Sequence, residues 1–261
     1  MEVVLCANAS DAAALASDAI ARLLDRKPEA VLGLATGSSP LGVYDELAGR
    51  VRSGSLSLAR ASGFLLDEYV GLPGDHEQSY RSVIDRDLVS KVDLDPAHVH
   101  GLDGVARDLV AECSSYEEVI ARAGGIDLQL LGIGADGHIG FNEPGSSLAS
   151  RTRIKTLTEQ TRRDNARFFG GDIDAVPRHC LTQGIGTVME ARHVVLLAAG
   201  PAKAEALRQL VEGPVSASWP ATALQLHPHV SVLLDPEASS SLERRDYYTE
   251  TFQAKPPWQG L

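Results

Sequence analysis

The sequence predicts an α/β fold, a single-domain, Rossmann-like three-layer sandwich whose mostly parallel sheet is flanked by helices on both faces. Short apolar runs alternate with segments whose apolar residues have helical spacing, as in parallel α/β sheets. The composition, 44% hydrophobic and 23% charged, is that of a globular protein. One large domain can accommodate 261 residues, and no repeat or long linker divides them. We therefore expect one domain over residues 1–261, with residues 254–261 as a surface tail.

The N-terminal segment begins the alternation. A short apolar strand at residues 3–5 precedes a helix that Ser10 and Asp11 are expected to begin. Apolar residues recur along this helix at intervals of three and four, which gives it one buried face. Lys27 and Pro28 are expected to end it.

The next segments repeat the pattern. Residues 30–35 are mostly apolar and do not alternate with polar residues, as expected of a strand covered on both faces. A polar loop at 36–40 leads into a helix at 41–52, and a third strand follows at 64–66. The same criteria predict helices near 79–88, 109–123 and 202–211 and strands at 126–133, 194–199 and 230–234.

Charge and composition exclude several classes of protein. Lys and Arg number 24 against 35 Asp and Glu, a net charge of −11, which argues against a nucleic-acid partner. No apolar run approaches the ~20 residues of a membrane span, and the start Met1-Glu2-Val3 lacks the basic segment of a signal peptide. The three cysteines are too widely spaced for a zinc finger. We expect a cytoplasmic protein with neither a nucleic-acid nor a membrane partner.

Unusual chemistry follows four of the predicted strands, in the segments 36–40, 67–71, 134–145 and 200–203. In parallel sheets, ligands bind at the carboxyl ends of the strands. The convergence of these segments at one edge is the main physical indication of a site.

The first segment, Thr36-Gly37-Ser38-Ser39, has the character of an anion-binding loop. Gly37 allows the backbone N–H groups to approach a ligand, Ser39 suits the N-cap, and the following helix N-terminus favours phosphate. The lysine and the spacing of a P-loop are missing. An ordinary strand–helix turn with a capping serine is the alternative.

The second segment places Asp67 and Glu68 directly after an apolar strand. A carboxyl group at a buried strand end has a raised pKa unless it is paired, and it can take a proton from carbon. A helix cap or an ion pair is the alternative for this dipeptide.

The third segment contains Asp136, His138 and Glu143 in a glycine-rich loop. Residues 132–137 fit G-x-G-x-x-G, but no helix pattern follows, so we do not expect a dinucleotide site. Two acids beside a histidine can orient an imidazole for proton transfer. Their spacing is not that of regular metal ligands, and we expect no metal. A further pair, His227 and His229, flanks a proline that indicates a turn rather than a metal site.

Two cations, Arg167 and Lys203, lie on other predicted helices. Each alone is more often a solvated surface charge. A sugar phosphate would require both or an equivalent pair.

Several of these stretches resemble glucosamine-6-phosphate deaminases. The most characteristic is Gly137-His138-Ile139-Gly140-Phe141-Asn142-Glu143-Pro144. The resemblance also includes Leu34–Leu47, Leu65–Leu72, Gly132–Arg153, Thr161–Phe169, Leu181–Thr187 and Leu224–Pro228. It implies conversion of glucosamine 6-phosphate and water to fructose 6-phosphate and ammonia, a step of amino-sugar catabolism, with no organic cofactor.

The resemblance also implies residue roles. Asp67 would move a proton between C2 and C1, and His138, supported by Asp136 and Glu143, would act in opening the sugar ring. Thr36, Gly37, Ser38, Ser39, Arg167 and Lys203 would hold the phosphate.

Two alternatives to this activity remain. One is a 6-phosphogluconolactonase, which shares the G-x-G-x-D-G-H segment but differs after the histidine. The other is a non-catalytic sugar-phosphate sensor, which should carry a DNA-binding helix-turn-helix that we do not find.

Some deaminases of this kind are hexamers activated by N-acetylglucosamine 6-phosphate, and part of that pattern is present. Ser146, Arg153, Lys155 and Thr156 match it, and in an extended segment Arg153 and Lys155 would share a face. Thr249 stands where the pattern has a tyrosine, with Tyr247 and Tyr248 just before it. We predict a hexamer with a retained effector site and weakened activation.

Overall fold

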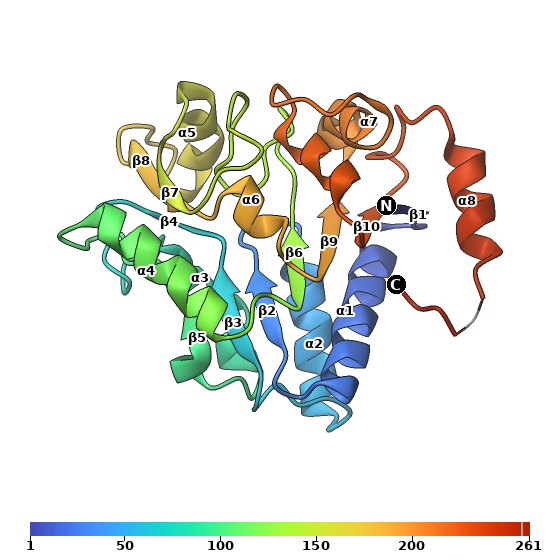
Figure 1. Cartoon of the computed structure of the whole chain (residues 1–261), viewed down its shortest axis with the longest axis horizontal. Helices are drawn as coiled ribbons and strands as arrows, with labels where there is room; N and C mark the ends of the chain where they lie inside the picture. Colours follow the sequence, from blue (N-terminus) through green and yellow to red (C-terminus); the bar gives the residue numbers. More distant parts are fainter. Residues whose placement is uncertain (257) are drawn as a thin grey trace.

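Seven strands pair in parallel in the central sheet of the computed structural model, which describes residues 1–256 and 258–261 (Figure 1). Their order is β1-β10-β9-β6-β2-β3-β5, and helices flank them as predicted. The strands are β1 Glu2–Leu5, β2 Val31–Leu34, β3 Ser62–Leu65, β5 Val99–His100, β6 Leu128–Leu131, β9 His193–Ala198 and β10 Val230–Leu234. Every strand predicted from an apolar run lies in this sheet.

A second, antiparallel sheet of three strands, in the order β4-β8-β7, lies beside the first. Its members are β4 Asp67–Tyr69, β7 Arg153–Thr156 and β8 His179–Thr182. The sequence did not predict this sheet, because its strands are short and its pairings join segments far apart in the chain. The expectation that Asp67 and Glu68 lie in a loop is therefore wrong, since both are in β4.

Five helices, α1, α2, α3, α4 and α7, fall close to the predicted ranges, whereas no range was predicted for α5, α6 and α8. They are α1 Ala9–Arg26, α2 Leu41–Arg52, α3 Tyr80–Asp87, α4 Leu109–Arg122, α5 Glu159–Asn165, α6 Ile185–Val188, α7 Ala204–Glu212 and α8 Arg245–Gln253. Short 3-10 helices include η3 Ala166–Phe168 and η4 Pro201–Lys203.

Two predicted helix caps need correction. The side chain of Asn8, not Ser10 or Asp11, caps α1 by accepting the N–H of Asp11 at 2.9 Å, so this helix begins earlier. Pro40 occupies the cap position of α2 in helical conformation, and the Ser39 side chain makes no cap hydrogen bond. Ser39 is thereby left to face the neighbouring loop.

The chain order creates a reversal in the middle of the parallel sheet. After β2 the chain moves outward through β3 and β5, then returns to β6 on the other side of β2. The loops that follow β2 and β6 therefore diverge, and a cleft at such a reversal is where open α/β sheets bind ligands.

The C-terminal segment packs along the first strand. Helix α8 contacts β1, and Lys255 forms an ion pair of 2.6 Å with Glu2. Leu261 packs against the main core. The predicted tail, 254–261, includes Pro257, which lies outside the described residues. None of the described helices combines the length and apolar character needed to span a bilayer.

Asp127 joins the amino ends of β2 and β6. Its carboxylate, 5% exposed as a residue, accepts the Val31 N–H at 2.8 Å and pairs with Lys27 and Arg192 at 2.8 and 3.0 Å. Removing it would leave a buried N–H without an acceptor, which is costly.

Asp127→Ala should accordingly lower the free energy of unfolding by about 1–3 kcal/mol. The matched control is Asp45→Ala, because Asp45 pairs with Lys91 while 68% of its side chain is exposed. That change should cost about 0–1 kcal/mol. Urea denaturation measures both, and equal losses would contradict a structural role for Asp127.

Candidate active site

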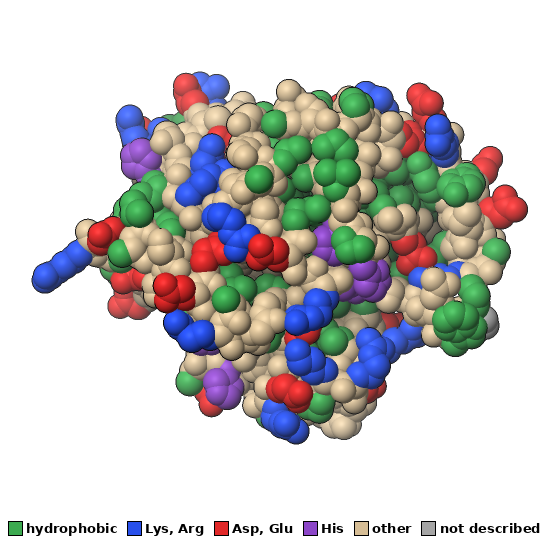
Figure 2. All heavy atoms as spheres, viewed as in Figure 1, with side chains coloured by type: hydrophobic (Ala, Val, Ile, Leu, Met, Phe, Trp, Pro, Cys, Tyr) green, Lys and Arg blue, Asp and Glu red, His purple; other side chains and the backbone are tan. Residues whose placement is uncertain are grey.

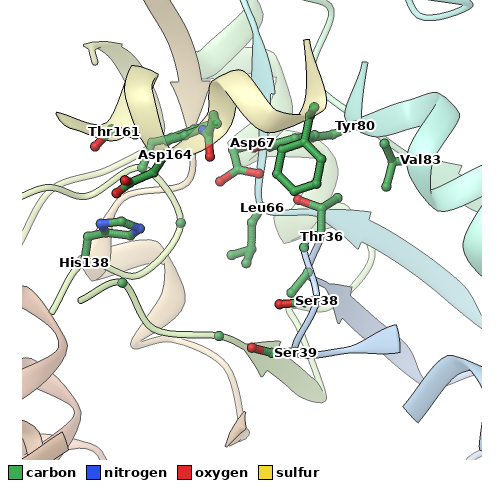
Figure 3. A pocket seen from close by; sticks show the side chains of 18 of the residues that line it. Thr36, Ser38, Ser39, Leu66, Asp67, Tyr80, Val83, His138, Thr161 and Asp164 are labelled. Atoms are coloured by element: carbon green, nitrogen blue, oxygen red, sulfur yellow. The ribbon is translucent and has the colours of Figure 1, made fainter. Parts of the chain in front are cut away.

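A cavity of about 550 Å³ lies at the carboxyl ends of β2 and β6, where the strand order reverses (Figure 3). Its lining includes Asp67, His138 and every residue predicted to hold phosphate, namely Thr36, Gly37, Ser38, Ser39, Arg167 and Lys203. Asp136 and Glu143 do not line it. The structure thus brings together most of the side chains that the sequence placed at strand ends.

The loop 36–39 presents its backbone to the cavity. Gly37 has φ +91°, a conformation that side chains disfavour. Among the described residues, no hydrogen bond uses the N–H groups of Gly37, Ser38 or Ser39. The Ser39 hydroxyl would lie 3.3 Å from a Cβ at Gly132, so a side chain there would crowd it. This loop has the donors and the open backbone that an anion needs.

Two cations line the cavity as well. Arg167 lies on η3 and Lys203 ends η4, and in the described part of the chain neither takes part in an ion pair. Burial, and then the charge of Arg167, lower the pKa of Lys203. A dianion between these cations and the loop 36–39 would relieve their mutual repulsion.

Asp67 places a carboxyl group inside the cavity, and Figure 3 shows it opposite His138. The residue is 6% exposed, and burial, followed by the nearby charge of Glu68, raises its pKa well above the ordinary value. No described side chain donates a hydrogen bond to it. A Cβ at Gly140 would come within 3.4 Å of its Oδ2, so the glycine leaves this carboxyl group room.

Glu68 points to the other side of β4 and has a different task. Its carboxylate accepts the N–H groups of Tyr69, Tyr80 and Arg81 at 2.8, 3.0 and 3.1 Å, and so caps α3. Burial raises its pKa, although these hydrogen bonds oppose the shift. Glu68 thus has the alternative role of a helix cap, whereas Asp67 is the buried carboxyl group without a hydrogen-bond donor among the described side chains.

His138 is held by Asp136. The ring Nδ1 of His138 lies 2.6 Å from Asp136 Oδ1, and the backbone N–H of His138 donates to the same oxygen at 3.2 Å. Burial alone would raise the pKa of Asp136, but the hydrogen bonds and charge of His138 lower it overall. A Cβ at Gly134 would stand 2.2 Å from His138 Cε1, so the ring requires a glycine there. With Nδ1 engaged, Nε2 is the nitrogen left for a ligand.

Glu143 is buried and faces α5. It accepts the hydroxyl of Thr161 at 2.5 Å and the N–H and hydroxyl of Thr158 at 3.2 Å each. No hydrogen bond or ion pair among the described residues joins it to His138. It links the glycine-rich loop to the helix that precedes Arg167.

The residues of the predicted effector site do not all meet. Arg153 and Lys155 are half-buried on one face of β7, and Arg153 Nη1 donates to Asn142 Oδ1 at 2.8 Å. Ser146 is buried, and Thr156 Oγ1 lies 3.2 Å from a histidine nitrogen. Thr249 is on α8, which packs on β1 at the far end of the molecule (Figure 1). One chain alone does not bring Thr249 to the others.

Sequence reasoning missed an aromatic wall and a polar rim. The ring of Tyr69 lies 5.0, 5.5 and 5.6 Å from those of Tyr80, Phe141 and Phe169. The cavity lining also includes Thr161, Asp164 and Asn165 of α5. These residues come from β4, α3, α5, the glycine-rich loop and the end of η3, and the long-range pairing of β4 with β8 brings Tyr69 to the others. No local pattern could have found them.

The fold and the cavity define an α/β protein in which a buried carboxyl group, a carboxylate-paired imidazole and a loop with a positive-φ glycine meet at one edge of the sheet. A family model described as glucosamine-6-phosphate isomerases/6-phosphogluconolactonase matches residues 6–233. Over the full length of both chains, the sequence is 66% identical to a glucosamine-6-phosphate deaminase of Beutenbergia cavernae and 63% identical to one of Mycolicibacterium smegmatis. The chain therefore belongs to the glucosamine-6-phosphate isomerase/6-phosphogluconolactonase family.

Solved structures give the same fold. A monomeric glucosamine-6-phosphate deaminase superposes with a TM-score of 0.90 at 44% identity, covering 92% of this chain and 100% of that one. The 6-phosphogluconolactonase of Trypanosoma cruzi gives 0.73 at 20% identity, with 93% and 97% coverage, and so shares the fold alone.

The pKa values of Asp67 and Asp136 should shift in opposite directions. Asp67 should titrate well above 3.8 and Asp136 below it, because burial dominates at the first and the His138 contacts at the second. Carboxyl ¹³C NMR, assigned with Asp67→Asn and Asp136→Asn, measures both midpoints.

The raised pKa of Asp67 also has a stability consequence. Burial disfavours the ionised form of Asp67 in the folded protein. The stability that the protonated carboxyl group contributes is therefore lost as the pH rises from the pKa of Asp67 in the unfolded chain towards its higher pKa in the folded protein. Asp67→Asn should therefore increase the free energy of unfolding at neutral pH. Coincident midpoints for the two aspartates would contradict this electrostatic assignment.

Proposed function

We propose that this protein converts glucosamine 6-phosphate and water to fructose 6-phosphate and ammonia, a step in the breakdown of amino sugars. The observation that carries the proposal is one cavity with an unpaired buried carboxyl, Asp67, opposite a carboxylate-held imidazole, His138. The same cavity presents a backbone anion loop and two cations. The names of the full-length relatives support it further.

The phosphate would bind first and fix the sugar. The unused N–H groups of Gly37, Ser38 and Ser39, together with Arg167 and Lys203, supply donors from two walls of the cavity. Anchoring C6 in this way holds C1 and C2 near the acid–base groups, which converts binding energy into positioning.

His138 would open the pyranose ring. Opening moves a proton from the C1 hydroxyl to the ring oxygen, and the ring nitrogen not engaged by Asp136 is placed to transfer it. Asp136 holds the imidazole in orientation. Glu143 would support it indirectly, by holding the loop to Thr158 and Thr161.

Asp67 would then act on carbon. It removes the proton from C2 of the open aldehyde to give an enolamine, and it returns a proton to C1. The C2–N bond becomes an iminium, which water hydrolyses to the ketone with release of ammonia. Low exposure makes the ionised carboxylate a strong base. Hydrogen only moves within the substrate and water adds, so this chemistry requires no organic cofactor.

The direct experiment is to incubate the purified protein with glucosamine 6-phosphate, without added nicotinamide or metal, and to measure ammonia and fructose 6-phosphate. Both should form in equal amounts. Hydrolysis of 6-phosphogluconolactone instead would show the other activity named for the family. Substrate binding without either reaction would indicate a sensor.

The two proton tasks can be separated. Asp67→Asn should reduce exchange of the substrate C2 hydrogen with deuterated solvent by ~10²–10⁴, because a positioned base is lost. His138→Gln should slow mainly the reaction of the closed-ring sugar. NMR of C2 deuteration measures the first effect. If both variants slowed the reaction of an open-chain substrate equally, the assignment of separate roles to Asp67 and His138 would be refuted.

The phosphate site predicts a large change in KM. Arg167→Gln or Lys203→Gln should weaken substrate binding by ~1.5–3 kcal/mol, since the phosphate would lose a hydrogen bond from a charged side chain. Arg163→Gln is the matched control, because Arg163 is exposed and pairs with Glu159 on the same helix. Unphosphorylated glucosamine should react very poorly. Comparable turnover of glucosamine and glucosamine 6-phosphate would contradict a phosphate-binding site in this cavity.

We also propose a cytoplasmic location and, separately from catalysis, a hexamer with an effector site. The free, buried cysteines Cys6, Cys113 and Cys180 suit a reducing compartment. The shared face of Arg153 and Lys155 supports a phosphate effector. The structural neighbour described as monomeric shows that a closely similar fold does not need assembly. Sedimentation, and saturation curves with and without N-acetylglucosamine 6-phosphate, test this part.

A further inference from the structure

A second cavity, of about 300 Å³, lies at the amino ends of β6, β9 and β10, the opposite edge of the sheet from the candidate active site. We call it the amino-end pocket and define it by Arg22, Arg26, Arg192 and His229. Figure 2 shows histidine side chains beside several Lys and Arg side chains on this face. Such a gathering of positive charge is unexpected in a chain of net charge −11.

The side chains that line the pocket carry more positive charge than the one acidic side chain among them, Asp127, can balance. Arg22 and Arg26 lie one turn apart on α1, a like-charged spacing that destabilises a helix slightly. Within the described residues neither forms an ion pair, whereas Asp127, the acidic residue in the lining, already pairs with Lys27 and Arg192. The dipole of α1 favours a cation in its last turn and so accounts for Arg26. It does not account for Arg22 or Arg192.

Two histidines form a flat wall beside these cations. The rings of His193 and His229 are stacked, with centroids 3.7 Å apart and planes 1° apart. His193 Nε2 lies 3.0 Å from the Ser231 hydroxyl, while no hydrogen bond in the described residues uses the ring of His229. Burial lowers the pKa of both rings, so a neutral His229 can donate an N–H without carrying a charge.

The turn before β10 holds His229 in place. His227 Nε2 lies 2.7 Å from the Ala191 carbonyl oxygen, and its Nδ1 accepts the N–H of His229 at 3.0 Å. Both hydrogen-bond partners of His227 are backbone groups, so these two hydrogen bonds stabilise the turn. The ring of His229 remains at the pocket.

We propose that the amino-end pocket binds a small, multiply charged oxyanion. Guanidinium groups pair with phosphate or carboxylate through parallel N–H donors, and Arg22 and Arg26 are the cations of this lining that form no ion pair within the described residues. The volume lies at the lower end of small-molecule sites, which fits a compact anion rather than a chain. The site is separate from the catalytic cavity, and it stands whether or not the proposed deaminase activity does.

The test uses the full chain carrying Arg167→Gln and Lys203→Gln, so that the catalytic cavity no longer competes for anions. Calorimetric titration with inorganic pyrophosphate and with citrate distinguishes a phosphate ligand from a polycarboxylate. At least one should bind saturably. Adding Arg22→Gln and Arg26→Gln should weaken it roughly 10- to 100-fold, through loss of charged hydrogen bonds.

The charge-matched control is Arg107→Gln with Arg245→Gln, two exposed arginines outside the pocket. It should leave affinity unchanged. A second readout is the imidazole ¹³Cε1 resonance of His229, assigned with His229→Gln, which should shift as the anion binds. Absence of saturable binding, or equal weakening by both double substitutions, would overturn the proposal. So would binding that leaves the His229 resonance unmoved.

Discussion

The candidate site depends on how the chain leaves the parallel sheet after β3. The carbonyl oxygen of Leu65 accepts two side-chain hydrogen bonds, from Tyr116 at 2.7 Å and Gln183 at 2.9 Å, and that of Leu66 accepts the N–H of Gln183 at 2.7 Å. All these groups are buried, so each carbonyl would be costly to leave unpaired. With them satisfied, the chain can turn into β4 and carry Asp67 into the cavity.

Strand β8, which pairs with β4, is also hydrogen-bonded to the glycine-rich loop. Thr182, opposite Asp67 in the antiparallel pair, accepts the N–H of Phe141 at 3.2 Å. Asn142 donates to the Gln183 carbonyl at 2.8 Å and receives a hydrogen bond from Arg153 at 2.8 Å. The Asp67 carboxyl group and the loop that carries His138 are therefore both positioned by β8 and by Gln183, the residue that follows it. Arg153, predicted from resemblance to bind an effector, also takes part in this positioning.

The sequence predicted the parts of the site that local patterns determine. The range of α2 was correct to the residue, and the loop before it lines the cavity as expected. The glycine-rich third segment carries His138 to the cavity as expected, and its ring packs against Gly134, where a Cβ would be 2.2 Å from Cε1. Asp67 could be identified as a candidate site residue because its carboxyl group directly follows an apolar strand.

Other features depend on contacts that local patterns do not contain. The pairing of β4 with β8 joins residues more than a hundred positions apart, and it brings Tyr69 and Tyr80 to the cavity. Glu143 is near His138 in sequence, but its hydrogen bonds go to Thr161 of α5 and to Thr158, the residue that caps this helix. The reversal of strand order, which locates the cavity, is likewise a property of the whole sheet.

The central claim is that Asp67 and the loop 36–39 act on the two ends of one sugar phosphate. A crystal structure with an unreactive open-chain analogue of glucosamine 6-phosphate, carrying an alcohol at C1, tests it most directly. We predict that the phosphate accepts the N–H groups of residues 37–39 and contacts Arg167 and Lys203, while the Asp67 carboxylate lies about 3–3.5 Å from C1 and C2. A phosphate bound elsewhere, or C1 and C2 out of reach of Asp67, would contradict the account.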